Sequence, residues 1–140
     1  MIKVQQQDFD QAHEYQTLLK NTDADGAIVT FVGKVRNHNL GENVKGLHLE
    51  HYPEMTQKAL MDIVQQAKTR WDLGNVTVIH RIGNLLIGEQ IVFIGVTSAH
   101  RKNAFEACEF IIDYLKVSAP FWKNELTDNG EKWLRSEERR

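Results

Sequence analysis

The 140-residue chain contains 41% hydrophobic and 26% charged residues, a composition typical of a folded globular protein and not of a disordered one. The formal net charge of -2 and the lack of a basic stripe argue against nucleic-acid binding, and a single cysteine excludes an internal disulfide. We expect one cytoplasmic domain over residues 1–140, because the N-terminal residues contain no signal peptide and the most apolar stretch, 91–96, is shorter than the roughly 20 residues that cross a bilayer.

The first half of the chain predicts strands that alternate with helices. Strands are predicted at 2–6, 27–35 and 44–52, a polar loop at 36–42, and helices at 10–20 and 53–71. In the strand at 44–52, Leu47 and Leu49 share one face, and His48 and Glu50 share the other. Pro53 suits the first turn of the helix that follows, because that position needs no backbone N–H donor.

The second half predicts strands at 76–82, 90–97, 121–127 and 131–135, a turn near Gly83 or Gly88, and a helix at 99–117. The strand at 90–97 is apolar on both faces and is therefore expected in the middle of a sheet. The helix has apolar residues at helical spacing, namely Ala104, Phe105, Cys108, Ile111, Ile112 and Leu115.

The C-terminal segment predicts a hairpin and a short tail. Asn129-Gly130 favours a tight turn between the last two strands, and residues 136–140 form a charged tail that we expect to be flexible. The order of the elements as a whole predicts an α+β fold, in which helices pack on a mostly antiparallel sheet.

A cationic pair marks the start of the helix at 99–117. His100 and Arg101 lie where the helix dipole and the unpaired N–H groups already favour an anion. One interpretation is an anion site in which Ser98 caps the helix and Arg101 binds the anion bidentately. The alternative is that both cations pair with surface carboxylates, as solvated surface charges commonly do.

Further cations lie near other strand and helix ends. Strand parity places Lys34 and Arg36 on one side, and Lys116 and Lys123 flank a predicted proline break. A lysine takes part in chemistry when burial or nearby cations make its proton easier to remove. Taken alone, these residues are more simply interpreted as solvated surface charges.

The remaining aromatic, histidine and cysteine residues favour structural roles. Phe121 and Trp122 either line a pocket for a flat ring or pack in a core or an interface. His80 shares a strand face with apolar residues and is expected to be a hydrogen-bonded core residue, and Cys108 lies in the apolar stripe of its helix. The sequence lacks a clustered Cys/His pattern, so we expect no metal site.

Several motifs occur together in one order along the chain. They are DGA (25–27), TFVGKVRNHN (30–39), LEHYP (49–53), VIHRIG (78–83), VTSAHR (96–101), DYLK (113–116) and APFWK (119–123). Together they resemble the catalytic large-subunit family of molybdopterin synthase, over the part of the chain between residues 25 and 125.

The resemblance implies an α/β hammerhead-like fold and a sulfurtransferase activity. Enzymes of this family add two sulfur atoms to cyclic pyranopterin monophosphate, which forms the dithiolene of molybdopterin in molybdenum cofactor biosynthesis. The sulfur arrives as a thiocarboxylate on the C-terminal Gly-Gly tail of a small ubiquitin-like subunit, and this tail inserts into a pocket of the large subunit. The family assembles as a large-subunit homodimer with one small subunit at each end, which makes a heterotetramer. The resemblance implies no further cofactor and no membrane partner.

The resemblance also assigns roles to individual residues. Lys116 matches the principal catalytic lysine, which is expected to stabilise negative charge and to shuttle a proton, and Lys123 matches the second essential lysine. The substrate-binding positions are Lys34, Val35, Arg36, His100, Arg101, Lys116, Lys123, Asn124 and Glu125. We expect their cations to form one anion-binding pocket. Whether some of them reach it from a second protomer stays open, as does any role for Arg135, Arg139 or Arg140.

Two functions of other classes fit the same cations. A non-catalytic module that binds a phosphorylated metabolite would use them for affinity alone, so Lys116→Ala would weaken binding without a separate chemical defect. A scaffold protein would use a cationic groove to dock the acidic tail of a partner, and it would have no affinity for a pterin phosphate.

Overall fold

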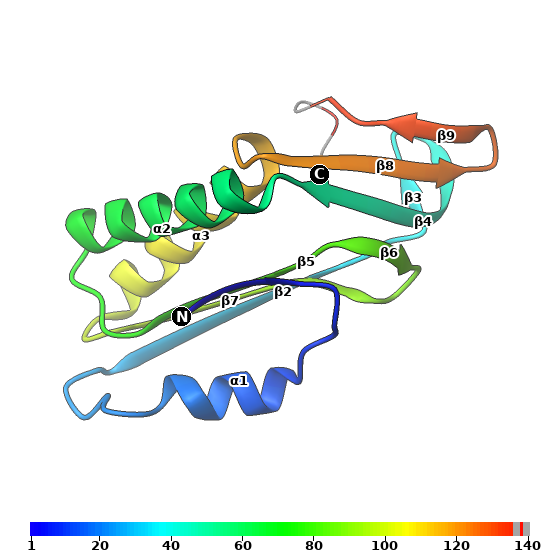
Figure 1. Ribbon diagram of the computed structural model, residues 1–140. Helices are drawn as coiled ribbons and strands as arrows, with labels where there is room; N and C mark the ends of the chain where they lie inside the picture. The colour runs from blue at the N-terminus through cyan, green and yellow to red at the C-terminus, as the bar shows by residue number, and fades with distance from the viewer. Residues whose placement is uncertain (136–137, 139–140) are drawn as a thin grey trace.

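The computed structural model in Figure 1 describes residues 1–135 and 138. Within these residues the strands are β1 (Ile2–Gln5), β2 (Ala27–Lys34), β3 (His38–Asn39), β4 (Glu42–His51), β5 (Val76–Arg81), β6 (Gly83–Leu86), β7 (Gln90–Ser98), β8 (Phe121–Thr127) and β9 (Gly130–Trp133). The helices are α1 (Gln11–Leu18), α2 (Pro53–Arg70) and α3 (Arg101–Val117). The predicted flexible tail at 136–140 lies, except for Glu138, outside the described residues.

The strands form two sheets. The first has the order β1-β5-β7-β2, in which β1 runs parallel to β5 and the other neighbours are antiparallel. The second has the order β3-β4-β8-β9, and β6 pairs with β4 as well. The two-sided apolar strand β7 lies inside the first sheet, as its pattern predicts. The predicted α+β fold with mostly antiparallel sheets is confirmed.

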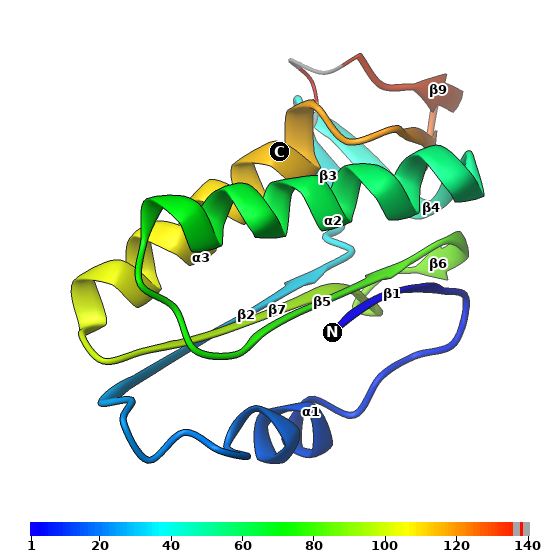
Figure 2. The ribbon, with the colours of Figure 1, turned by 60° about the vertical axis from the view of Figure 1, so that its left-hand side comes forward.

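Helices cover both faces of the first sheet. Figures 1 and 2 show α2 and α3 side by side on one face and α1 on the opposite face. The second sheet lies near the start of α2 and the end of α3, because β4 leads into α2 and α3 leads into β8. None of the helices in the described part of the chain is long and apolar enough to cross a lipid bilayer.

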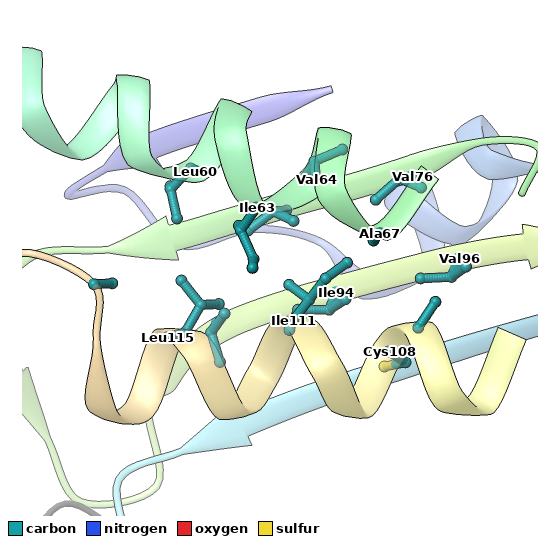
Figure 3. Packing of buried hydrophobic residues seen from close by; sticks show 14 of the residues in the cluster. Leu60, Ile63, Val64, Ala67, Val76, Ile94, Val96, Cys108, Ile111 and Leu115 are labelled. Atoms are coloured by element: carbon teal, nitrogen blue, oxygen red, sulfur yellow. The ribbon is translucent and has the colours of Figure 1, made fainter. Parts of the chain in front are cut away.

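The main core fills the space between the helix pair and the first sheet. Figure 3 shows that labelled apolar side chains of α2 and α3 point toward one another on the same face of the sheet. The buried members include Leu60, Ile63, Val64 and Ala67 from α2, Ala104, Ala107, Cys108, Ile111 and Leu115 from α3, and Val76, Val78, Ile94 and Val96 from the sheet. This packing fixes α3 as a straight element across the sheet and therefore fixes both of its ends.

A smaller core lies on the other face of the sheet, under α1. It contains Phe9, Leu18, Ile79 and Phe93. The Asp10 side chain caps α1, because its Oδ1 atom accepts hydrogen bonds from two backbone N–H groups of the first turn, at 3.0 and 3.2 Å. Gly95 of β7 lies directly beneath α1, where an added Cβ would overlap the side chain of Leu18. A glycine is therefore required where the helix crosses the strand.

Two short strands are not predicted by the sequence pattern. β3 lies within the predicted polar loop, and β6 lies within the predicted turn region after β5. Both pair with β4, β3 with its first two residues and β6 with Gly46–Leu49. Neither strand shows enough alternation to be recognised alone, and it is pairing with β4 that makes each a strand.

The start of α3 also differs from the prediction. Ser98 does not cap the helix, because it is the last residue of β7 and its hydroxyl donates to the Asp72 carbonyl oxygen at 2.7 Å. The N-cap residue is His100, whose side chain makes no capping hydrogen bond. Within the predicted apolar stripe, Phe105 is 62% exposed and Ala107 is buried instead. The reason is angular, since Phe105 lies about 100° around the helix from Ala104.

Truncation of Ile111 tests this packing. Ile111→Ala should lower the free energy of unfolding by about 2–5 kcal/mol, because it leaves a cavity between the two helices and the sheet. Urea denaturation followed by circular dichroism measures the change. Phe105→Ala on the exposed side of the same helix is the matched control and should cost less than about 1 kcal/mol. Equal losses in the two variants would contradict the orientation of α3.

Candidate active site

A cavity of about 270 Å³ opens at the C-terminal end of α3, where the two sheets meet. Strands β2, β4, β5, β7 and β8 contribute to its walls together with α3. Its lining residues are Phe31, Gly33, Lys34, Arg36, Leu49, His80, Ile91, Val92, Ile112, Leu115, Lys116, Phe121 and Lys123. We call this cavity the cationic pocket, because lysine and arginine supply most of its polar side chains.

Two of the cations come from the end of β2. Lys34 and Arg36 both line the pocket, as strand parity predicts, and the intervening Val35 points the other way into the core of the second sheet. Val35 is 2% exposed, and its backbone N–H and carbonyl are bonded to Glu89 and Gly88 at 2.9 and 2.8 Å. The structure thus places Lys34 and Arg36, but not Val35, among the lining residues.

The other two cations flank the break after α3. Lys116 lies in the last turn of the helix, where the negative end of the helix dipole favours a cation. Its neighbour Leu115 is 5% exposed, so burial of Leu115 holds this turn against the sheet. Lys123 lies on β8 opposite Leu49 of β4, and it is half-buried. The structure thus brings Lys34, Arg36, Lys116 and Lys123 together in one pocket.

Arg36 is held by a hydrogen-bonded relay that leads away from the pocket. Its Nη2 atom donates to Asn39 Oδ1 at 3.1 Å, and Asn39 Nδ2 donates to Glu125 Oε1, also at 3.1 Å. Asn39 and Glu125 are each 4% exposed. Glu125 therefore does not line the pocket but supports Arg36 through Asn39. Asn124 is likewise buried and lies outside the lining.

The cations at the start of α3 lie far from this pocket. Arg101 precedes Lys116 by fifteen residues on one helix, which corresponds to about 22 Å at about 1.5 Å per residue. Figure 1 shows the start of α3 at the end of the helix remote from β8. Within a single chain, His100 and Arg101 therefore do not share one pocket with Lys116, because a packed helix holds its two ends apart.

Apart from the four cations, His80 is the polar side chain among the described lining residues. This residue is 7% exposed on β5, and its ring stacks on Phe121 with the ring centroids 3.9 Å apart. Burial lowers the pKa of His80 to about 4, and the charges of His51 and Lys123 lower it further against the hydrogen bond to the Arg81 carbonyl. The prediction of a hydrogen-bonded core histidine is confirmed, but the sequence gives no signal that it also faces a cavity.

The structure also places Cys108, Phe121 and Trp122, for which the sequence predicts a structural role or a place in a pocket. Cys108 is 5% exposed in the core, as predicted, and burial raises the pKa of its thiol to about 11, which removes its nucleophilic thiolate form at neutral pH. Phe121 lines the pocket, whereas Trp122 is 40% exposed and packs edge-on against Tyr52.

The sequence of this chain is similar to those of known proteins. A family model described as MoaE protein matches residues 4–118. A protein from Escherichia coli named molybdopterin synthase catalytic subunit is 60% identical over 137 residues, which cover 98% of this chain and 91% of that protein. A protein of the same name from Vibrio cholerae is 59% identical over 135 residues, which cover 96% of this chain and 89% of that protein.

Solved structures share the fold. A molybdopterin biosynthesis MoaE protein from Burkholderia ambifaria superposes with a TM-score of 0.83 at 43% identity, and the match covers 100% of this chain and 90% of that one. A protein–protein complex of subunits 1 and 2 of the molybdopterin-converting factor from Helicobacter pylori contains a chain that matches with a TM-score of 0.77 at 27% identity, over 99% of this chain and 91% of that one.

The buried imidazole of His80 makes stability depend on pH. Between pH 6.5 and about 4, the unfolded chain binds a proton on His80 that the folded chain does not. Its contribution to the free energy of unfolding is therefore fully present above pH 6.5 and lost as the pH falls, by about 2.5 kcal/mol at pH 4.5. Urea denaturation at pH 7 and pH 4.5 measures it. His80→Gln should lose about 2.5 kcal/mol less than the wild type over this range, whereas the control His13→Gln should lose as much as the wild type. An unchanged pH dependence in His80→Gln would contradict the neutral buried imidazole.

Proposed function

The chain belongs to the MoaE protein family, and we propose that it acts as the catalytic subunit of a molybdopterin synthase, a sulfurtransferase. In this reaction sulfur passes from the C-terminal thiocarboxylate of a small ubiquitin-like subunit to cyclic pyranopterin monophosphate. The observation that carries the proposal is the cationic pocket, which joins four cations to apolar side chains. The names of the relatives and the two-subunit complex from Helicobacter pylori support the same activity and the same partner.

The charge of the pocket suits both reactants. The substrate carries a phosphate and the sulfur donor carries a thiocarboxylate, so both are anions. Lys34, Arg36, Lys116 and Lys123 line the pocket, and no carboxylate is among its described lining residues. At an effective dielectric constant of about 20, each cation–anion pair at about 4 Å contributes roughly 4 kcal/mol before the cost of desolvation. The apolar side chains beside these cations offer a surface for a flat ring system.

The chemistry requires a group that stabilises negative charge and moves a proton. The donor sulfur forms a bond to a substrate carbon, where a carbon–oxygen bond breaks and the departing oxygen takes a proton. The bond between this sulfur and the acyl carbon then breaks when water adds, which leaves the small subunit with a carboxylate. We assign the stabilisation of the resulting tetrahedral oxyanion, and the proton transfer, to Lys116. Lys123 assists by binding the substrate and stabilising charge. Lys34 and Arg36 bind anionic groups, and Asn39 and Glu125 hold Arg36 in place.

His100 and Arg101 enter this scheme only through a second copy of the chain. The distance along α3 prevents them from reaching the pocket of their own chain. The family assembles as a homodimer within a heterotetramer, and in such a dimer the start of α3 from one chain is free to approach the pocket of the other. We therefore assign these two residues to substrate binding across the dimer interface. Val35 and Asn124 are buried outside the pocket lining, so we assign them no contact with substrate.

The remaining parts of the proposal concern the chain as a whole. Residues 1–140 act as one functional domain, which the full coverage of this chain by the Burkholderia ambifaria match supports. The protein works in the cytoplasm, in keeping with its bacterial relatives in cofactor biosynthesis.

Single-turnover sulfur transfer tests the role of Lys116. The purified chain is mixed with thiocarboxylated small subunit and cyclic pyranopterin monophosphate, and dithiolene product is measured. Lys116→Ala should lower the rate at least about a hundredfold, and Lys116→Arg should also lose most activity, because arginine keeps its charge but does not release its proton. Lys20→Ala, an exposed lysine on the far face, is the control. Normal turnover by Lys116→Arg would exclude the proton transfer, and tight binding without product in the wild type would favour a non-catalytic binding module.

Mixed dimers test the assignment of Arg101. A dimer purified with one Lys116→Ala chain and one Arg101→Ala chain contains one site with both defects and one site with neither, if Arg101 acts across the interface. Such a dimer should retain about half of the wild-type activity, although each parent homodimer is impaired at both sites. If Arg101 acted within its own chain, both sites of the mixed dimer would be defective and its activity would be no higher than that of the better parent.

A further inference from the structure

We propose that His80 contacts the substrate, and that its Nε2 atom accepts a hydrogen bond from an N–H group of the flat nitrogen heterocycle bound in the cationic pocket. This inference rests on the proposed function, since it takes the bound ring to be that of the pyranopterin substrate. It adds a residue that recognises the ring to the residues that bind the anionic groups.

The position of His80 meets the first requirement, which is access to the pocket from a buried site. The residue lies on β5, where it pairs with Val92 of β7, and both residues line the pocket. It is 7% exposed, so the ring is enclosed by protein except where it meets the cavity. Phe121 from β8 closes one side of the ring by stacking at an interplanar angle of 16°.

The hydrogen bonding of His80 fixes which nitrogen faces a ligand. Nδ1 lies 2.7 Å from the carbonyl oxygen of Arg81. A carbonyl oxygen only accepts, so Nδ1 carries the hydrogen, and in the neutral ring Nε2 then has a lone pair and no hydrogen. Burial keeps the ring neutral by lowering its pKa to about 4. At neutral pH, Nε2 is therefore an acceptor.

The Nε2 atom has access to the cavity. Among residues 1–135 and 138, the hydrogen bond found for the His80 side chain is the one through Nδ1, and none is found to Nε2. It is also absent from the fully enclosed polar atoms without a partner in this part of the chain, which are Glu14 Oε2, His51 Nδ1 and Asn124 Oδ1. Because His80 lines the pocket, we infer that Nε2 is the atom that it presents to a ligand there.

The rest of the lining explains why such an acceptor matters. The other polar side chains among the described lining residues are Lys34, Arg36, Lys116 and Lys123, and all of them are hydrogen-bond donors only. These groups match the oxygens of a phosphate or a thiocarboxylate, but they cannot satisfy an N–H donor. A heterocycle that buries N–H groups here needs an acceptor, because an unpaired buried donor weakens binding. Among those side chains, His80 alone supplies one.

A role in proton transfer fits the same atom less well. A group that titrates near pH 4 is a weak base at neutral pH and would hold a proton taken from a lysine or from substrate only briefly. A fixed ring that stacks on Phe121 instead favours orientation, since it presents one lone pair in one direction. His80 is thus a binding residue whose loss affects the recognition of the ring.

Two substitutions at His80, each measured against two ligands, test the inference. His80→Phe keeps a flat ring next to Phe121 but removes the acceptor, and His80→Gln restores an acceptor at a similar reach. The dissociation constant of cyclic pyranopterin monophosphate is measured by calorimetry, and inorganic phosphate, which has no ring, serves as the second ligand. His80→Phe should weaken binding of the pterin at least about tenfold. Binding of phosphate should change less than about twofold, and His80→Gln should recover most of the lost pterin affinity.

The outcomes separate this inference from the proposed function. Equal affinity of wild type and His80→Phe for the pterin would overturn the role of His80, but it would not contradict the proposed function of the protein. Parallel weakening of pterin and phosphate in both variants would also overturn it, because it would indicate a collapsed pocket, which circular dichroism and thermal unfolding would reveal. Failure of the wild type itself to bind or convert the pterin would instead reject the proposed function, on which the inference rests.

Discussion

The packing of α3 on the first sheet determines where the cations of this protein can act. Ile111 and Leu115 are buried against the strands and against α2, so the helix is held along much of its length. Lys116 follows Leu115 directly, and burial of Leu115 therefore sets Lys116 at the edge of the pocket. The same rigidity carries His100 and Arg101 to the remote end of the helix. One helix thus presents cations in two places, and in the proposed dimer its two ends serve two different pockets.

The second sheet gives the pocket its other wall and also controls its charge. Glu125 lies on β8, two residues beyond Lys123, and a carboxylate in the pocket would compete with the anionic substrate for the cations. The fold avoids this by burying Glu125 and pairing it with Asn39, which in turn accepts a hydrogen bond from Arg36. The negative charge of Glu125 therefore orients Arg36 through a neutral amide, and the bond to that amide uses one of the five N–H donors of the guanidinium group.

Much of the fold and part of the site could be predicted from the sequence, for identifiable reasons. The alternation of Leu47 and Leu49 with His48 and Glu50, the proline at the start of α2 and the two-sided apolar pattern of β7 are local signals, and all are confirmed. Parity likewise placed Lys34 and Arg36 on one side. The strands β3 and β6 depend on pairing with β4, which no local pattern encodes.

The separation of the expected site residues in the fold has a geometric origin. Residues from motifs that belong to one family signature need not meet in space within one chain. The length of α3 alone is enough to separate Arg101 from Lys116. The burial of Val35 follows from the same parity that places Lys34 and Arg36 on one side, whereas the burial of Asn124 and Glu125 becomes visible only when β8 is paired with β4.

The pocket joins two kinds of recognition that place opposite demands on its side chains. Anionic groups require donors with positive charge, and a flat heterocycle requires an apolar surface with an acceptor for its own N–H groups. A protonated imidazole at the position of His80 would add a further cation and remove the acceptor. Burial prevents this, because it keeps the ring neutral while the Arg81 carbonyl fixes the hydrogen on Nδ1. Desolvation of His80 thus lowers the free energy of unfolding in acid. The same desolvation keeps Nε2 a hydrogen-bond acceptor among four cations, as the proposed binding of a ring requires.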